Sequence, residues 1–405
     1  MRTAKLKDIT LTITDGKHGD CKNHDGSGYY FISCKDVYDE TIHYENARQI
    51  TEDDFRDADR RTNLAAYDIL ITNSGTIGRM ALVKDIPETR KTTFQKSVAI
   101  VRADTSQVVP NYLYYLLKSK VHDFINSSNG SAQKNLLLST MRDFDISFVD
   151  SFETQHRIAT ILSRYDSLIE NYQKQIKLLE EAAQRLYKEW FIDLHFPEHE
   201  NTKIVDGVPE GWEKKTIADV CTNISSGSTP SRSNKAYWEN GTIKWVKTKE
   251  LQDGWILDTE EYISQEGYNS SSTKIFPANT ILMAIYASPT LGRLGILSTD
   301  CCCNQAALGL IADENIISWQ WLFWKLYELR DEFNAIARGA GQQNISGIVV
   351  KNKEIIIPDK GVIDGFTSVV SKMFEQQKSL SSQLRLLTEA RDRLLPKLMS
   401  GEITV

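Results

Sequence analysis

The sequence lacks the features that mark secreted, membrane-spanning and metal-bound proteins. Its six cysteines include the consecutive residues Cys301, Cys302 and Cys303 but no C-x-x-C pair, whereas a zinc site or a disulfide framework needs spaced ligands. No segment approaches the roughly 18 apolar residues that cross a bilayer. The first residues, MRTAKLKDIT, lack the apolar stretch of a signal peptide. We therefore expect a cytoplasmic protein that holds no metal ion.

Motifs for catalysis are also missing. The sequence contains no phosphate-binding G-x-x-x-x-G-K-[ST] loop, no H-E-x-x-H and no G-x-S-x-G. Because it has no Pro-Pro pair, it also lacks the N-P-P-[YF] or D-P-P-Y motif of amino-methyltransferases. A nuclease-like E-x-K occurs at Glu213–Lys215, but three residues arise easily by chance and no upstream acid accompanies them. The pattern predicts a chain with no catalytic residues of its own.

The size and charge of the chain limit the remaining possibilities. At 405 residues and 46.0 kDa, the chain exceeds one ordinary hydrophobic core, so we expect two or three domains. The net charge of −6, taken alone, weighs against a nucleic-acid-binding protein, which usually presents a basic face. The decisive question is therefore where the basic residues lie.

The two halves of the chain repeat one another. Short segments recur in the same order, at residue numbers that differ by 208 to 214. The matched segments are Leu6–Ile9 with Ile217–Val220, Phe31–Val37 with Trp245–Leu251, Ser74–Met80 with Ser288–Leu294, Thr93–Gln95 with Cys303–Gln305, and Asn129–Leu136 with Arg338–Ile345. The sequence therefore predicts a duplication with small insertions.

Each half predicts a compact α/β domain. Short β-type segments such as AAYDILITNSG and PANTILMAIYASP are separated by glycine, asparagine, aspartate and serine, and one aromatic-rich helix interrupts them. A final strand is expected at Phe144–Val149 and at Glu354–Ile357. The predicted division is a first domain at 1–152, a helix at 153–193, a linker at 194–210, a second domain at 211–360 and a second helix at 361–405.

After each domain the apolar residues adopt the alternating spacing of three and four that defines a coiled-coil seam. The seam residues are Leu162, Tyr165, Ile169, Tyr172, Ile176, Leu179, Ala183, Leu186 and Trp190, and then Val370, Met373, Gln377, Leu380, Leu384, Leu387, Arg391, Leu394 and Leu398. We expect the two helices to form an antiparallel coiled coil; alternatively, each packs only on its own domain. The polar residues Gln377 and Arg391 either fix the register or mark the place where a partner protein replaces the partner helix.

Between the halves, residues 195–211 (HFPEHENTKIVDGVPEG) are polar and contain two prolines, which is typical of a linker. His195 and His199 are four residues apart, as two metal ligands on one helix would be. Pro197 between them disfavours a helix there. A solvated loop is the better interpretation.

Amide and basic side chains gather in the loops of both halves. Amides suit bidentate contact with adenine edges, and Arg and Lys suit guanine edges and phosphates. The DNA-binding candidates of the first half are Lys17, His18, Lys22, Lys35, Asn73, Ser74, Thr76, Arg79, Lys91, Gln95, Lys96, Gln133, Lys134 and Asn135. Those of the second half are Ser228, Thr229, Arg232, Lys235, Lys247, Lys249, Ser288, Thr290, Arg293, Asn304, Gln305, Arg338, Gln342, Gln343 and Asn344. Because these segments contain few acids, an acidic protein can still present a basic face.

The candidates divide into two groups. Residues matched in both halves, such as Arg79 with Arg293 and Asn135 with Asn344, either hold the fold or grip phosphate whatever the DNA sequence. Residues that differ between the halves are the better candidates for base recognition, because two domains that recognise different half-sites must differ there.

The chain resembles the specificity subunits of Type I restriction-modification systems. The segment Lys174–Phe191 is similar to the central helix of that family, and supporting matches are G-S-x-Q-K-N at Gly130–Asn135 and Glu153-Thr-Gln155 leading into Ile158–Leu162. The order of domain, helix, domain, helix is the family's layout. The second half departs from it, because Gly361–Gly365 stands where a counterpart of Glu153-x-Gln155 is expected.

The resemblance implies a DNA-recognition role without catalysis, in a bacterium or an archaeon. Each domain would be a target-recognition domain for one half of a split site in double-stranded DNA. The helices would set the spacing and dock two methyltransferase subunits, which carry S-adenosylmethionine and methylate adenine. Restriction subunits, with ATP and Mg²⁺, would join the larger complex and cut DNA elsewhere. This chain itself would need no cofactor.

A bipartite site agrees with the length of the predicted seam. From residue 162 to 190, a rise of about 1.5 Å per residue gives roughly 42 Å, enough to hold two domains over major grooves about one DNA turn apart. Two alternatives stay open. One is the recognition fragment of a fused restriction–methylation enzyme, and the other is a coiled-coil scaffold whose domains do not touch DNA.

Overall fold

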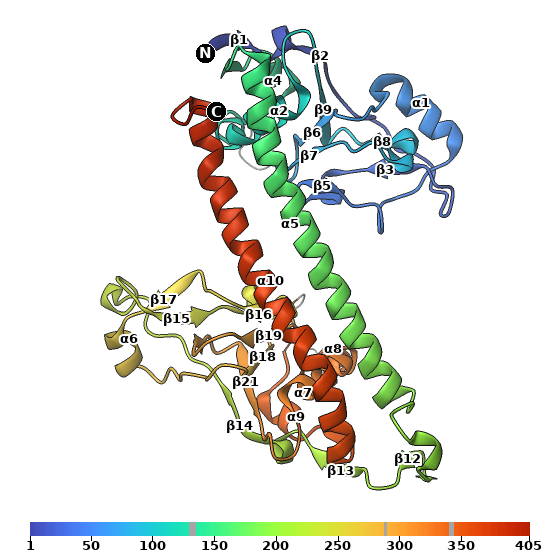
Figure 1. Cartoon of the computed structure of the whole chain (residues 1–405), viewed down its shortest axis with the longest axis vertical. Coiled ribbons are helices and arrows are strands. Elements are labelled where there is room, and N and C mark those ends of the chain that lie inside the picture. The colour runs from blue at the N-terminus through green and yellow to red at the C-terminus, as the bar shows by residue number, and fades with distance from the viewer. Residues whose placement is uncertain (129–134, 287–289, 340–343) are drawn as a thin grey trace. The chain divides into compact units, whose positions relative to one another are not determined.

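The structure is a computed structural model of the chain and describes residues 1–128, 135–286, 290–339 and 344–405 (Figure 1). The chain divides into two compact units. Unit 1 combines residues 1–168 with 387–405, and unit 2 contains residues 169–386. Among the described residues, no helix is both long and apolar enough to cross a bilayer.

The centre of unit 1 is an antiparallel sheet with the strand order β2–β9–β6–β7. Its strands are β2 (Thr10–Asp15), β9 (Val98–Ala103), β6 (Ile69–Thr72) and β7 (Met80–Leu82). Side chains of a strand alternate between faces, so Ile69 and Ile71 enter one hydrophobic core and Leu70 enters another. Helix α2 (Pro110–Ser119) packs in the first of these cores. The sheet is therefore buried on both faces, which explains why all four residues of β6 are buried and the first three are apolar.

Smaller elements complete unit 1. The pairs are β1 (Arg2–Lys5) with β10 (Asp145–Phe148), β3 (Tyr30–Ile32) parallel to β8 (Thr92–Phe94), and β4 (Val37–Tyr38) with β5 (Thr41–Ile42). The helices are η1 (Leu6–Ile9), η2 (Cys34–Asp36), α1 (Glu52–Thr62), η3 (Pro87–Lys91), α3 (Val121–Asn126) and α4 (Leu138–Arg142). The side chain of Thr51 accepts the Asp54 N–H and starts α1, and the left-handed residue Asn63 ends it.

Unit 2 repeats this topology and adds a strand. Its main sheet has the order β14–β21–β18–β19–β16, with β14 (Cys221–Ser226), β21 (Ala307–Ala312), β18 (Ile281–Ala284), β19 (Leu294–Leu297) and β16 (Gly254–Ile256). Two further sheets are β13 (Glu213–Thr216) with β22 (Glu354–Ile357), and β17 (Glu261–Ile263), β15 (Ile243–Val246) and β20 (Cys302–Cys303). The helices are η6 (Ala218–Val220), η7 (Lys235–Tyr237), η8 (Thr248–Glu250), α6 (Gln265–Asn269), α7 (Trp319–Glu328), α8 (Arg330–Gly339) and α9 (Gly347–Lys351). The duplication predicted from the sequence is thus a duplication of strand order.

Two long helices, α5 (Phe152–Tyr187) and α10 (Lys360–Ser400), each contribute to both units. In unit 1, Leu162 shares a core with Leu398, and the carboxylate of Asp166 accepts a hydrogen bond of 2.7 Å from Arg391. In unit 2, Trp190 contacts Phe366 at 6.1 Å between ring centroids. In unit 2, Ile176 and Gln377 also line one pocket. Within each unit the two helices therefore run antiparallel, as expected from their equal place in the two repeats.

The seam is the covered face of both helices. Leu162, Ile169, Ala183, Val370, Leu380 and Leu398 are buried, as are the polar residues Gln377 and Arg391. The other predicted seam residues are half-buried: Tyr165, Tyr172, Ile176, Leu179, Leu186, Trp190, Met373, Leu384, Leu387 and Leu394. The domain boundaries predicted from the sequence stay a prediction.

Candidate nucleic-acid interface

In unit 1, main-chain hydrogen bonds tie four loops together at the carboxyl end of β2. The N–H of Lys17 donates to Phe94 O (2.7 Å), and the N–H of Lys96 donates to Lys17 O (3.1 Å). The N–H of Asn73 donates to Ser97 O (3.0 Å), and the N–H of Leu136 to Asn73 O (2.8 Å). These loops, at residues 16–18, 73–74, 94–97 and 135–136, carry many of the predicted DNA-binding residues. We call them, with their counterparts in unit 2, the loop frame.

The same frame is present in unit 2, at residues 227–229, 285–286, 303–306 and 344–345. The N–H of Ser228 donates to Cys303 O (2.9 Å), that of Ile285 to Ala306 O (2.9 Å), and that of Ile345 to Ile285 O (3.0 Å). In both units the asparagine of the amide loop forms a β-bridge, Asn135 with Ser74 and Asn344 with Tyr286. The predicted fold-holding role of these asparagines therefore has a structural basis in their main chains.

Two glycines that the sequence comparison missed make the frame possible. A Cβ atom on Gly16 would lie 2.0 Å from Phe94 O, and one on Gly227 would lie 2.1 Å from Cys303 O. Any side chain would collide with this main chain, so only glycine fits. The available signal was a glycine seven residues after each of the matched segments Leu6–Ile9 and Ile217–Val220.

The structure corrects two of the residue matches made from the sequence. Gln95 corresponds to Asn304 rather than Gln305, because the N–H of Gln95 donates to Ile32 O and that of Asn304 to Val246 O, on equivalent strands. Because residues 95 and 305 are both glutamine, the match made from the sequence was shifted by one residue.

The second correction concerns the loop after β6 and β18. An equivalent hydrogen bond joins residues 72 and 78 in unit 1 and residues 284 and 292 in unit 2, so the loop of unit 2 is two residues longer. Ser74 therefore corresponds to Tyr286 and not to Ser288. Ser288 itself, like the predicted residues Gln133, Lys134, Gln342 and Gln343, lies outside the described residues.

Several predicted basic residues of unit 1 have acidic neighbours. Lys17 forms ion pairs with Asp54 (3.5 Å) and Asp57 (3.1 Å), and hydrogen bonding to Asp57 raises the pKa of Lys17. His18 contacts Asp15 at 3.0 Å. The other basic candidates of this unit are exposed: Lys22, Lys35, Arg79, Lys91 and Lys96. The expectation that acids lie apart from the basic loops is therefore wrong at Lys17 and His18, where acidic residues fold back onto them.

Unit 2 shows the same compensation. Lys247 forms ion pairs with Glu260 (2.9 Å) and Glu261 (3.0 Å), and Lys249 pairs with Glu260 (2.6 Å). Arg232 pairs with Glu261 (2.6 Å), while Lys235 and Arg338 are exposed. These pairs reduce the net positive charge at the loop frame, so fewer uncompensated basic side chains lie there than the sequence predicts.

The remaining polar candidates of unit 2 bond to one another or to nearby residues. The hydroxyl of Thr229 donates to Gln305 Oε1, and the hydroxyls of Ser228 and Ser272 lie 2.8 Å apart. The hydroxyl of Thr290 donates to Tyr286 O (3.2 Å), and Arg293 Nη1 donates weakly to Gln252 Oε1 (3.4 Å). Thr76 of unit 1 is exposed.

Two frame asparagines carry buried amide oxygens. Asn73 Oδ1 and Asn304 Oδ1 are covered and have no hydrogen-bond partner among the described residues. An unpaired buried polar atom costs about 1–3 kcal/mol unless water or a ligand satisfies it. The two atoms lie at different places in the frame, because Asn304 corresponds to Gln95 and Asn73 corresponds to Ile285.

Where α10 enters unit 1, the buried residue Arg391 donates to Asp166 (2.7 Å) and Glu40 (2.9 Å). Tyr115 donates its hydroxyl to Asp166, and Lys118 pairs with Glu40 (2.6 Å). Of the two roles predicted for a polar seam residue, this arrangement supports register fixing, because Arg391 already has partners in its own unit.

The corresponding junction in unit 2 is aromatic. Ala183 stands at the position equivalent to Arg391 and is fully buried. Phe374 stands at the position equivalent to Asp166 and packs on Trp319 (5.0 Å), Phe323 (5.8 Å) and Trp324 (6.4 Å between centroids). The two halves therefore use different chemistry for the same contact.

Gln155, part of the Glu153-x-Gln155 motif, is a buried brace in unit 1. Its Oε1 accepts the N–H of Val109 (2.8 Å), and its Nε2 donates to Val149 O (2.7 Å). In unit 2 the equivalent position is Ile363, which is buried in an apolar core. The second half thus lacks the Glu153-x-Gln155 motif because an apolar residue, Ile363, fills the place of the glutamine.

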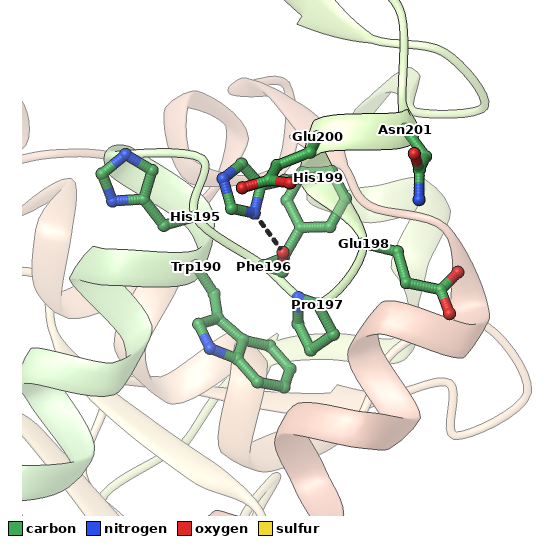
Figure 2. Close-up of a pocket in the computed structure, with 8 residues that line it drawn as sticks. All are labelled: Trp190, His195, Phe196, Pro197, Glu198, His199, Glu200 and Asn201. Atoms are coloured by element: carbon green, nitrogen blue, oxygen red, sulfur yellow. Dashed lines mark hydrogen bonds between the residues drawn. The ribbon is translucent and has the colours of Figure 1, made fainter.

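The predicted linker lines a pocket of about 390 Å³ in unit 2, formed by Trp190 and residues 195–201 (Figure 2). The linker contains η5 (His199–Asn201), β11 (Ile204–Val205) and β12 (Val208–Pro209), and η4 (Lys188–Ile192) precedes it. His199 is hydrogen-bonded to Phe196 O (2.8 Å), and its ring lies 5.3 Å from that of His195. Among the described residues, no group of three or more His, Cys, Asp or Glu side chains could hold a metal ion there.

Comparison with known proteins places this geometry in a family. A family model described as "Type I restriction modification DNA specificity domain" matches residues 3–181 and 209–380. The chain is 30% identical over 396 residues to the Type I restriction enzyme MjaIX specificity subunit of Methanocaldococcus jannaschii, covering 95% of this chain and 89% of that protein. It is 26% identical over 370 residues to the HindI specificity subunit of Haemophilus influenzae, covering 75% and 80%.

A solved structure agrees in fold. The S subunit of a Type-I restriction-modification system from M. genitalium superposes with a TM-score of 0.63 at 16% identity, covering 98% of this chain and 96% of that one. The duplicated domains and paired helices are therefore a shared architecture.

Proposed function

The chain belongs to the family of Type I restriction-modification DNA specificity subunits, and from this premise we propose that each unit recognises one half of a bipartite DNA site. The observation that carries the proposal is the loop frame, in which three main-chain hydrogen bonds recur in both units while the side chains differ. A constant frame with variable side chains suits two domains that grip similar backbones and recognise different bases.

The long helices would set the distance between the half-sites. Helix α5 is continuous over 36 residues and contributes to both units, as α10 does. An uninterrupted helix resists bending, so it suits the role of a spacer.

The outward faces of these helices would dock the methyltransferase subunits. Leu168, Leu178, Val369 and Leu386 of these helices expose between 43% and 56% of their surface, so their apolar side chains are accessible to a partner. In this proposal the chain is non-catalytic. Two methyltransferase subunits supply S-adenosylmethionine and methylate adenine, and restriction subunits supply the ATP- and Mg²⁺-dependent cleavage.

The experiment uses the chain together with its methyltransferase subunits. Sequencing of methylated DNA from a host that expresses the complex should show one motif with two specified halves and an unspecified gap. Insertion of seven residues into both α5 and α10 adds about 10.5 Å and should lengthen the gap by up to about three base pairs. An unchanged gap would rule out the spacer role.

Salt-dependent binding separates this function from its alternatives. Lys96→Ala should weaken binding to all duplexes and reduce the slope of log affinity against log salt by about one, because one phosphate contact is lost. Lys7→Ala, at the other end of β2 and paired with Asp143, is the matched control and should change neither. A complex that binds no duplex DNA would leave only a scaffold role, and methylation by this chain alone would favour a fused enzyme.

A further inference from the structure

We propose that Arg232 recognises a guanine in the second half-site through direct contact with the base edge. The inference rests on the proposed function, since it assigns one base contact within the DNA surface of unit 2. Arg232 lies three residues beyond Thr229 of the loop frame, in the loop that follows β14.

Two tryptophans hold the guanidinium group of Arg232 in a fixed plane. Its Cζ lies 3.6 Å from the ring centroid of Trp238 and 4.9 Å from that of Trp245. The two indoles are themselves in edge-to-face contact at 5.0 Å. Because a planar guanidinium stacks on an aromatic face, this arrangement removes much of the rotational freedom of a long side chain before any ligand binds.

The tryptophans are anchored to the same loop. Trp245 is buried and donates its indole N–H to Ser228 O (2.9 Å), while Trp238 donates to Ser231 O (3.1 Å). The loop that carries Arg232 is therefore fixed by the residues on which Arg232 stacks. Recognition of a base edge needs this kind of preorganisation, because each immobilised side chain otherwise costs entropy on binding.

One edge of the guanidinium is occupied and another is not. Its Nη2 donates to Glu261 Oε2 (2.6 Å). Although partial burial opposes its ionisation, the hydrogen bonds from Arg232 and Lys247 lower the pKa of Glu261, which keeps this carboxylate charged. Among the described residues, Nε and Nη1 of Arg232 have no hydrogen-bond partner, and 49% of its side chain is exposed. Glu261 takes only one of the two N–H groups of Nη2. The second N–H of Nη2 and the N–H beside it, on Nε or Nη1, form an edge of two parallel donors that matches the O6 and N7 acceptors of guanine.

Unit 1 provides an internal contrast. There Phe31 occupies the place of Trp245, and Arg48 lies over its ring at 5.5 Å. All three side-chain nitrogens of Arg48 are already used, in hydrogen bonds to Asn23, Asp20 and Cys21 O. Arg48 is thus a structural arginine, whereas Arg232 keeps two donors for a ligand.

The test measures base preference at each position of the motif for the complex with its methyltransferase subunits. DNA libraries randomised across both half-sites are methylated and sequenced. The wild-type complex should specify a G·C pair at one position of the second half-site. Arg232→Ala should reduce the preference at that position by about 10- to 100-fold and leave the first half-site unchanged. Trp238→Leu keeps Arg232 but removes one ring on which its guanidinium stacks. It should therefore reduce the base preference at the same position.

Arg232→Lys distinguishes base recognition from a phosphate contact. Lysine keeps the charge but cannot donate two parallel hydrogen bonds, so overall affinity should persist while preference at the one position falls. Lys214→Ala on β13, which is paired with Glu354, is the control and should change neither measurement.

The outcomes separate the two proposals. If Arg232→Ala and Arg232→Lys leave every position of the motif unchanged, or lower affinity equally for all sequences, the guanine contact is refuted and the bipartite function stands. If the wild-type complex shows no base preference at all, the proposed function fails, and the guanine contact fails with it.

Discussion

Replacement of Arg391 by alanine tests whether the buried ionic cluster holds α10 in unit 1. Only 7% of the Arg391 side chain is exposed, compared with 32% for Glu40 and 26% for Asp166. Although burial opposes the charge, the hydrogen bond to Asp166 and the proximity of Glu40 raise the pKa of Arg391, so it stays protonated throughout the working range. The side chain is therefore a permanent cation, and the neighbouring Asp392 (2.9 Å) also pairs with it.

The expected loss of stability depends on the partners that Glu40 and Asp166 retain when Arg391 is removed. Removal of one partner of a buried ion pair typically costs about 3–5 kcal/mol, because a charge is left uncompensated. Here Glu40 keeps Lys118, and Asp166 keeps the hydroxyl of Tyr115. Since both acids are also partly exposed, we expect Arg391→Ala to lower the free energy of unfolding of unit 1 by about 2–3 kcal/mol. For a unit of this size, that corresponds to a decrease of about 4–12 °C in melting temperature.

The positions of the tryptophans make the assay selective. All eight lie within residues 169–386, so tryptophan fluorescence reports on unit 2, whereas circular dichroism reports on both units. Arg391→Ala should produce an earlier circular-dichroism transition without moving the fluorescence transition. It should also accelerate amide hydrogen exchange in residues 387–405. Arg393→Ala, an exposed neighbour on α10, is the control. Equal behaviour of the two variants would refute the assignment of Arg391 as the residue that holds the helix.

Three further changes test other parts of the structure. Gly227→Ala should destabilise unit 2 by at least about 2 kcal/mol in fluorescence-monitored denaturation, because the new Cβ meets main chain, whereas Gly254→Ala has open space and should be nearly neutral. Gln155→Ala should cost about 2–4 kcal/mol in circular dichroism, since two main-chain groups lose their partner. Burial, and then the negative charge of Asp253, raise the pKa of Glu180, so folding favours its protonated form and stability falls as pH rises through that pKa. Glu180→Gln should therefore raise the unfolding midpoint of unit 2 near neutral pH and have little effect at pH about 4, and a gain of equal size at both pH values would contradict this reasoning.

The repeated order of short segments was sufficient to predict the duplicated α/β fold. The seam spacing predicted that the two long helices pair, and their equal place in the two repeats predicted that they run antiparallel. Both signals are periodic and local, so they persist when individual residues change. The match of Asn135 with Asn344 was correct because the β-bridge that each forms constrains the loop from both sides.

Contacts between distant segments could not be predicted in this way. Nothing in the pattern around Lys17 indicates that Asp54 and Asp57 on α1 return to neutralise it. By spacing alone Arg391 is an irregular seam residue, and its partner Glu40 lies more than 300 positions earlier in the chain. Such pairs depend on how loops cross in three dimensions, which composition and spacing do not record.

Unit 1 is built from two segments that are far apart in the chain, which has a consequence during synthesis. Its core requires Leu395, Leu398 and Met399, which leave the ribosome more than 200 residues after Leu162, the α5 residue beside which they pack. The first recognition unit therefore stays unfinished at its helix face until the second has been made. An interrupted product would leave the apolar side of α5 uncovered, and such exposed surface favours recognition by proteases and chaperones.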